Sequence, residues 1–265
     1  MNGKDRIVVA LDVDNMNKAL ELVKELRHHV GYFKVGMELL TSEGAPKVVS
    51  ELKKASGKIF YDGKFNDIPN TVAGASRAVT KLGVDMFNVH CLGGSAMMKA
   101  TREAAEEISR DQNRTRPLIL GVTLLTSLDY DDLVELGICD SLNIANPEEL
   151  AWVKRERIEQ LAVAHLAWLA QKSGLDGVIA SPQEIRAIRR YCQPEFLVVT
   201  PGVRPEWAAK EDQKRVMTPW EAIGAGADYL VIGRPITKPP AEISSPTEAA
   251  KMIAKEIEQA MENNS

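Results

Sequence analysis

The sequence has few cysteines, no long hydrophobic run and no excess of basic charge. Its three cysteines, Cys91, Cys139 and Cys192, are odd in number and far apart, which favours reduced thiols over a disulfide framework or a zinc site. No apolar run approaches the roughly 18 residues that a membrane-spanning helix needs, so we expect no membrane segment. The N-terminal residues lack the apolar core and small-residue cleavage site of a secretory signal. We therefore expect a cytoplasmic protein.

The charge balance argues against an anionic macromolecular partner. The formal net charge is -4, from 33 Lys and Arg against 37 Asp and Glu, so no overall basic field exists to hold a nucleic acid or an anionic membrane. The chain has 265 residues, of which 45% are hydrophobic and 26% charged, a composition typical of a globular protein. No linker rich in Pro, Gly or Ser divides it. We predict one domain over residues 1–265, with no nucleic-acid partner.

The spacing of apolar residues predicts an alternation of strands and helices along the whole chain. Short β-branched runs recur about every thirty residues, and the segments between them carry apolar residues at helical spacing. The predicted strands cover residues 7–12, 32–36, 59–64, 86–90, 118–123, 177–181, 196–202 and 229–233. Eight βα units in this length, with several strands apolar on both faces, predict an α/β fold in the form of a single (β/α)8 TIM barrel. An open, doubly wound sheet is the alternative.

A cation stands between two carboxylates at the end of the third predicted strand. Residues 59–61 are typical of a strand entering a core, and a period of two places Asp62 and Lys64 on the same face. Asp67 follows three residues later. Charged side chains are rarely buried without partners, so this arrangement favours a functional site over its alternative, a surface turn with a salt bridge.

The first two predicted strands contribute two further charges, Asp12 and Lys34. Because the active site of a TIM barrel lies at the C-terminal ends of its strands, we expect these charges to surround one mouth. Neighbouring carboxylates favour a charged ammonium, whereas a Schiff-base lysine needs an apolar or cationic setting to lose its proton. Lys64 is therefore predicted to donate a proton rather than to act as a nucleophile.

The last two predicted strands are each followed by glycine and arginine, at residues 202–204 and 233–234. The loops after strands seven and eight form the phosphate site of many TIM barrels. Glycine permits close approach of the backbone, and arginine offers charge-assisted donors. We predict a phosphate site that includes Arg204 and Arg234. The polar segment 205–217 is longer than a simple turn requires and is predicted to close over the ligand.

Seven motifs together resemble the orotidine 5′-monophosphate decarboxylase family over nearly the whole chain. They are VALD at 9–12, FKVGMEL at 33–39, DGKFNDIPNT at 62–71, VTLLTS at 122–127, TPGVRP at 200–205, DQKRVMTP at 212–219 and VIGRP at 231–235. The resemblance implies a TIM barrel that converts orotidine 5′-monophosphate to UMP in the last step of pyrimidine synthesis. It also implies a homodimer with shared active sites and no metal or organic cofactor. Gly63 and Asn66 stand where the common bacterial form of the family has Leu and His, but neither position carries the charge chemistry.

The resemblance also implies roles for individual residues. Lys64 would protonate C6 of the pyrimidine as carbon dioxide leaves, and Asp62 would lie beside the substrate carboxylate. Lys34 and Asp67 would complete the charge network, with Asp67 and Thr71 reaching in from the other subunit. The remaining implied substrate contacts are Asp12 and Lys34 at the ribose, Thr126 and Ser127 at the pyrimidine, Arg204, Gln213, Gly233 and Arg234 at the phosphate, and in addition Ile68 and Pro201.

Two other functions stay open at this point. One is a keto-sugar-phosphate decarboxylase or aldolase-like enzyme of the same superfamily, in which the second strand ends in a carboxylate for a metal. Here that strand carries the cation Lys34, which would repel a metal ion. The other is a non-catalytic protein that binds a phosphate ligand. Such a protein has no need of four alternating charges beside its pocket, whereas a decarboxylase uses a fixed ammonium to stabilise and protonate the carbanion.

Overall fold

The computed structural model describes residues 2–55, 57–138, 155–208 and 217–263. Eight strands form a closed barrel in sequential order, and every neighbouring pair is parallel. The strands are β1 Ile7–Ala10, β2 Tyr32–Val35, β3 Ile59–Phe65, β4 Met86–His90, β5 Leu118–Val122, β6 Gly177–Ile179, β7 Leu197–Thr200 and β8 Tyr229–Ile232. The predicted TIM barrel is confirmed, and the open sheet is excluded.

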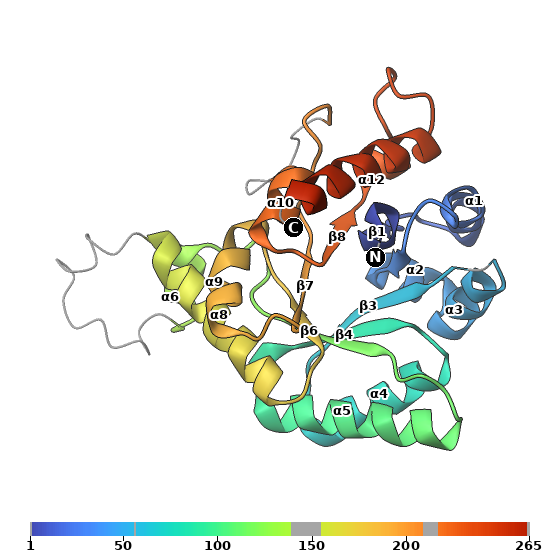
Figure 1. Cartoon of the computed structure of the whole chain (residues 1–265). Coiled ribbons are helices and arrows are strands. Elements are labelled where there is room, and N and C mark those ends of the chain that lie inside the picture. The colour runs from blue at the N-terminus through green and yellow to red at the C-terminus, as the bar shows by residue number, and fades with distance from the viewer. Residues whose placement is uncertain (1, 56, 139–154, 209–216, 264–265) are drawn as a thin grey trace.

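Helices surround the barrel, with the strands at the centre (Figure 1). The α-helices are α1 Met16–Leu26, α2 Met37–Glu43, α3 Ala45–Lys54, α4 Pro69–Lys81, α5 Gly94–Asp111, α6 Tyr130–Glu135, α8 Arg155–Lys172, α9 Ile185–Tyr191, α10 Pro219–Ala225, α11 Arg234–Thr237 and α12 Pro246–Asn263. Short 3-10 helices are η1 Gly3–Arg6, η2 Cys91–Gly93 and η4 Pro182–Glu184. No helix within the described ranges is long and apolar enough to cross a membrane.

Local sequence signals explain where several helices begin and which face they bury. Asn15 caps α1 by accepting a hydrogen bond from the Lys18 backbone N–H, and the helix buries Ala19, Val23 and Leu26 at helical spacing against the sheet. Pro69 stands at the start of α4, where its missing N–H costs no helical hydrogen bond. The side chains thus fix the direction in which each helix packs on the barrel.

The barrel has two apolar layers, one inside it and one between strands and helices. The inner cluster is small and consists of Val8, Ala10, Phe60, Met86, Leu120, Val199, Tyr229 and Val231. A larger cluster of alternate strand residues and inward helix faces fills the outer layer. Because side chains alternate along a strand, residues two positions beyond the inner cluster point to the C-terminal mouth. Phe60 is buried inside, so Asp62, two positions further on, follows it towards that mouth.

Three turns at the opposite, N-terminal end of the barrel share the pattern Gly-x-Asp. Each glycine adopts a positive φ, of 79° at Gly83, 85° at Gly174 and 110° at Gly226, which glycine tolerates without steric cost. Each aspartate accepts a hydrogen bond from a backbone N–H of the preceding strand. The pairs are Asp85 with Ile59 at 2.8 Å, Asp176 with Ile119 at 2.7 Å and Asp228 with Val198 at 2.8 Å. These carboxylates tie neighbouring strands together.

Candidate active site

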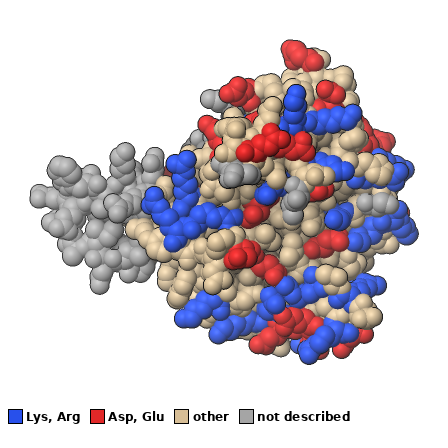
Figure 2. Space-filling view, in the orientation of Figure 1, with Lys and Arg blue, Asp and Glu red and all other residues tan. Residues whose placement is uncertain are grey.

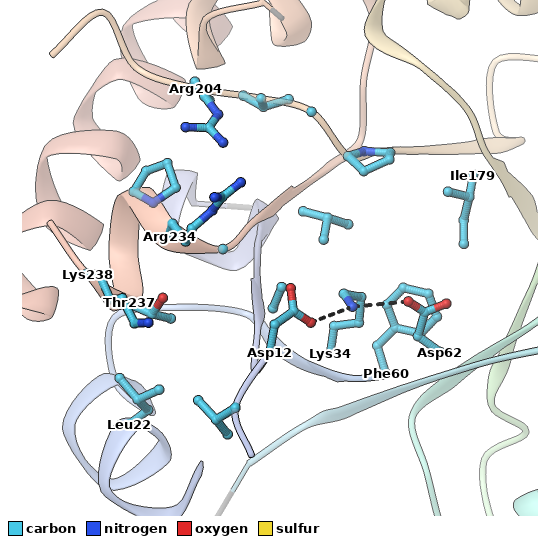
Figure 3. Close-up of a pocket in the computed structure, with 18 of the residues that line it drawn as sticks. Asp12, Leu22, Lys34, Phe60, Asp62, Ile179, Arg204, Arg234, Thr237 and Lys238 are labelled. Atoms are coloured by element: carbon cyan, nitrogen blue, oxygen red, sulfur yellow. Dashed lines mark hydrogen bonds and ion pairs between the residues drawn. The ribbon is translucent and has the colours of Figure 1, made fainter. Parts of the chain in front are cut away.

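A cavity of about 730 Å³ opens at the C-terminal ends of the strands (Figure 3). Its lining includes most of the charged residues that the sequence placed at strand ends. These are Asp12 after β1, Lys34 on β2, Asp62 and Lys64 on β3, Arg204 after β7 and Arg234 after β8. Six side chains that are far apart in the sequence therefore share one mouth, because the barrel brings all its strand ends to the same face.

Ion pairs link four of these charges into a continuous row. The Nζ atom of Lys34 lies 3.3 Å from Asp12 Oδ1 and 3.1 Å from Asp62 Oδ2, and Figure 3 shows it between the two carboxylates. The Nζ atom of Lys64 lies 2.7 Å from Asp62 Oδ1. Asp62 is buried, whereas the Asp12 side chain is 64% exposed, so the row runs from solvent into the barrel.

The two central members of the row, Lys34 and Asp62, favour each other's charged forms. Burial raises the pKa of the Asp62 carboxyl, but Lys34 and Lys64 outweigh burial and bring this pKa below its ordinary value. Burial lowers the pKa of the Lys34 ammonium, but Asp62 and Asp12 outweigh it and raise the pKa above its ordinary value. Lys34 and Asp62 therefore carry fixed, opposite charges at neutral pH.

The strand that carries Lys64 is irregular where the charges lie. Tyr61 pairs with Phe87 of β4, but the next pair in register is Phe65 with Val89. Residues 62–64 are the extra length, and Lys64 has a φ of 47°, which is uncommon for a residue with a side chain. Gly63 lies under the ring of Tyr61, where an added Cβ would come within 2.5 Å of a ring carbon. The period of two correctly predicted that Asp62 and Lys64 converge, but a bulge rather than a regular strand brings them together.

The sequence motifs did not identify Asn88, a fully buried residue of β4 in contact with this row. Its Nδ2 donates a hydrogen bond to Asp62 Oδ1 at 2.7 Å, and its Oδ1 accepts one from the Lys64 backbone N–H, also at 2.7 Å. The available signal was a polar residue at the centre of the strand, between the apolar Phe87 and Val89 and on the same face as Met86.

The two arginines lie on the other side of the cavity from Lys34 and Asp62 (Figure 3). Arg204 is buried, and its backbone N–H donates to the Met217 carbonyl at 2.9 Å. Arg234 is exposed at the start of α11. Pro201 and Gly233 also line the cavity. One side of the cavity thus carries two arginines and is suited to bind an anionic group. The other side carries the row of alternating carboxylates and ammonium groups, which is suited to proton transfer.

The structure separates the other predicted site residues into three groups. Thr126 lines the cavity, whereas Ser127 is exposed and does not. Asp67, Ile68 and Thr71 are exposed at the rim and do not line the cavity of their own chain. Gln213 lies outside the described residues, as does most of the segment that was predicted to close over the ligand.

Charges elsewhere on the surface are mixed in sign. Figure 2 shows Lys and Arg side chains interspersed with Asp and Glu over the face in view, as the near-balanced composition predicts. Among the described residues, no group of three or more His, Cys, Asp and Glu side chains is arranged to hold a metal ion.

Comparison with known proteins gives a consistent result. The model of the orotidine 5′-phosphate decarboxylase / HUMPS family matches residues 5–253. Orotidine 5′-phosphate decarboxylase of Moorella thermoacetica is 51% identical over 97% of this chain and 94% of that protein, and the enzyme of the same name from Syntrophomonas wolfei is 45% identical over 98% and 100%. The crystal structure of orotidine 5′-phosphate decarboxylase from Lactobacillus acidophilus superposes with a TM-score of 0.74 at 35% identity, over 95% of this chain and 98% of that one.

Proposed function

The chain belongs to the orotidine 5′-phosphate decarboxylase / HUMPS family and is a carboxy-lyase, and from this premise we propose that it converts orotidine 5′-monophosphate to UMP and carbon dioxide with Lys64 as the proton donor. The observation that carries the assignment of Lys64 is its ion pair with the buried Asp62, inside a cavity whose far side holds Arg204 and Arg234. An ammonium group that a buried carboxylate keeps protonated can act as a general acid but not as a nucleophile.

The proposed reaction needs one bond to break and one proton to move. As the bond between C6 and the carboxylate breaks, its electron pair stays on C6 and carbon dioxide leaves. The ammonium of Lys64 stabilises the developing negative charge and then supplies the proton that completes UMP. Asp62 would lie beside the substrate carboxylate, and Lys34 keeps Asp62 charged from its other oxygen. The reaction as proposed requires no metal and no organic cofactor.

The phosphate of the substrate is proposed to bind Arg204 and Arg234, with Gly233 and Pro201 beside it. Both arginines lie apart from the charge row, so the phosphate would be held at a distance from the reacting carbon. Binding energy from a remote group contributes to the rate when it fixes the reacting part of the substrate. Asp12 and Lys34 are proposed to bind the ribose, and Thr126 and Ser127 the pyrimidine. Gln213 is proposed as a further phosphate contact.

We also propose that the protein works as a homodimer with shared active sites. Asp67, Ile68 and Thr71 are exposed on the loop and first turn that follow β3, and the Ile68 side chain is 66% exposed. Further exposed apolar residues follow β2, β4 and β5 at the same end of the barrel, namely Met37, Leu92 and Leu125. A second copy that covered this rim would bury apolar area and bring its own Asp67 and Thr71 to the mouth.

The test of the reaction is a direct assay. Purified protein is mixed with orotidine 5′-monophosphate in buffer that contains a metal chelator, and the ultraviolet absorbance of the substrate is followed. Its loss, with UMP as the product, is expected. Unchanged absorbance under these conditions would rule the proposal out.

Sharing of sites across the dimer is tested by mixing two inactive variants. Lys64→Ala and Asp67→Ala proteins, after subunit exchange, should form heterodimers in which one of the two sites has both residues. We expect up to about a quarter of wild-type activity from random exchange. If subunit exchange is demonstrated and activity does not return, the sites are not shared.

A further inference from the structure

We propose that Asn88 is a positioning residue that holds both Lys64 and Asp62 in the geometry needed for proton transfer. The inference rests on the proposed function, because it concerns the same reaction. Asn88 lies on β4, is fully buried and does not line the cavity, so a substrate in the cavity would meet Lys64 and Asp62 rather than Asn88. Any effect it has on the chemistry must act through these two neighbours.

The bulge in β3 explains why Lys64 needs an outside partner. Between the pairs Tyr61–Phe87 and Phe65–Val89, residues 62–64 of β3 stand opposite Asn88 alone. The backbone N–H of Lys64 instead donates to the side-chain Oδ1 of Asn88 at 2.7 Å. A buried N–H without a partner is costly, so this bond stabilises the bulge as it stands.

The backbone of Lys64 also needs support because its conformation is unfavourable. A φ of 47° on a residue with a side chain lies in the left-handed region, and a sparsely populated conformation of this kind persists only where surrounding contacts hold it. Two sets of contacts surround the bulge. The rings of Tyr61 and Phe65, which flank the bulge in the sequence, pack against each other with their centroids 5.8 Å apart. The Asn88 side-chain amide accepts a hydrogen bond from the Lys64 backbone N–H.

The second atom of the same amide orients the carboxylate. Asn88 Nδ2 donates at 2.7 Å to Asp62 Oδ1, which is also the oxygen that accepts from Lys64 Nζ at 2.7 Å. A backbone N–H can only donate and an ionised carboxylate can only accept, so the two partners determine which way the amide points. One side chain therefore fixes the main chain of the proton donor and the carboxylate that holds its ammonium.

Loss of this amide should reduce the rate more than the binding of substrate. A displacement of about 1 Å in a reacting group costs roughly 10²-fold in rate. Asn88→Ala is therefore expected to lower kcat by about 10²-fold, with little change in KM, because the residues proposed to bind phosphate are untouched.

A matched control separates positioning from general loss of stability. Thr101 is also fully buried, and its Oγ1 donates to the Met97 carbonyl within α5, away from the cavity. Thr101→Val removes one buried hydrogen bond at nearly constant volume, so it should lower the melting temperature and leave kcat unchanged. If kcat of the Asn88→Ala protein falls no further than that of this control, or if the loss is entirely in KM, the inference is overturned.

The variant Asn88→Asp keeps the shape of the side chain and tests the donor separately. The introduced carboxyl still accepts from the Lys64 N–H but, when ionised, repels Asp62, so its pKa should be raised. Once protonated it donates to Asp62 as the amide does. The other charged or titratable groups nearby are Lys64, Lys34 and His90, and all three are present in the wild type.

The expected result is that kcat of Asn88→Asp relative to wild type increases as pH is lowered. A ratio that stays constant with pH would contradict the donor role of Asn88. In the ligand-free protein, exchange of the Lys64 amide hydrogen, measured by NMR, should be slow in wild type and Thr101→Val and much faster in Asn88→Ala. Equal protection in all three would overturn the inference. Because exchange needs no substrate, a wild type that fails to decarboxylate would contradict the proposed function but not this contact.

Discussion

The aspartates at the two ends of the barrel have different kinds of partner. At the N-terminal end, Asp85, Asp176 and Asp228 each accept from a backbone N–H of a neighbouring strand as well as from a cationic side chain. At the C-terminal end, Asp12 and Asp62 pair with lysines that line the cavity. One residue type thus serves two purposes in the same barrel.

The difference follows from what each carboxylate has to hold. A backbone N–H is part of the fold, so a carboxylate bound to it stabilises the register of the strands. A lysine ammonium has three N–H donors, so one that is paired with a carboxylate at the mouth can still donate to a ligand in the cavity. Stability is therefore concentrated at one end and chemistry at the other, as is general for this fold. Substitutions at the two ends should accordingly affect different measured quantities.

The largest expected effect is that of Lys64→Ala at the C-terminal end. Removal of the proposed proton donor should lower kcat by about 10⁴-fold, since general acid catalysis and charge stabilisation are lost together. The free energy of unfolding should change little, because Asp62 retains Lys34 and Asn88 as partners. The measurement is loss of substrate absorbance, with urea unfolding alongside. Near-normal turnover in this variant would refute the acid role.

The second effect should appear at the opposite end and in stability alone. Asp176 accepts from the Ile119 N–H and forms two hydrogen bonds with Arg116, at 2.8 and 2.6 Å. Asp176→Asn should lower the free energy of unfolding by about 2–3 kcal/mol, because a charged acceptor in a largely buried site is lost. Turnover per folded molecule should be unchanged. A drop in kcat without a shift of the urea midpoint would break the proposed division between the ends.

The third prediction concerns the cationic side of the cavity. Arg234→Ala should raise KM by roughly 10- to 10²-fold, the equivalent of one charge-assisted interaction, with a smaller effect on kcat. Inorganic phosphate should also become a weaker inhibitor of this variant. An unchanged inhibition constant for phosphate would show that Arg234 does not contact that group.

The fourth prediction concerns the pH dependence of stability at the C-terminal end. The pKa of Asp62 is below its ordinary value of 3.8 in the folded protein. The stability that this shift contributes is therefore fully present above 3.8 and is lost as pH falls through the lower, folded-state pKa. Urea unfolding from pH 6 downward should show the difference between wild type and Asp62→Asn diminishing in the acid range. A difference that does not vary with pH would contradict the shift.

The smallest effect is expected for Lys53→Ala, the matched lysine of the N-terminal end. Lys53 pairs with Asp85 at 2.9 Å, but its side chain is 38% exposed. Exposed ion pairs of this kind contribute at most about 1 kcal/mol, so the free energy of unfolding should fall by no more than this. The value of kcat should be unchanged. Comparison with Lys64→Ala asks whether loss of an ion-paired lysine as such affects catalysis. A large loss of kcat here would remove the distinction between the two ends.

Most of the fold could be predicted from the sequence because it depends on local patterns. All eight strands lie where the β-branched runs predicted them, and β4 Met86–His90 has the predicted bounds. Six of the other strands end one or two residues earlier than predicted, as β1 does at Ala10, whereas β3 ends one residue later, at Phe65. Sequence patterns identify such elements well but not their ends.

The site was predictable only in part. Charged residues at strand ends were visible in the sequence, and the barrel does bring Asp12, Lys34, Asp62 and Lys64 together. The assignment of Asp67 and Thr71 to a second subunit stays a prediction. Asn88 was missed because a single polar residue in a strand has no motif around it. Its importance depends on a bulge in the neighbouring strand, which periodicity alone would not predict.

The sequence by itself determined the alternation of strands and helices, the charge types at the strand ends and the membership of a family, because each depends on residues close together in the chain or on overall similarity. Only the tertiary structure decided which charges pair. Lys34 lies between Asp12 and Asp62, and Asn88 reaches the bulged backbone of Lys64, because barrel closure and strand register bring distant residues within hydrogen-bond distance. The Asp62–Lys64 pair that stood out in the sequence thus depends on a residue 24 positions further along the chain from Lys64.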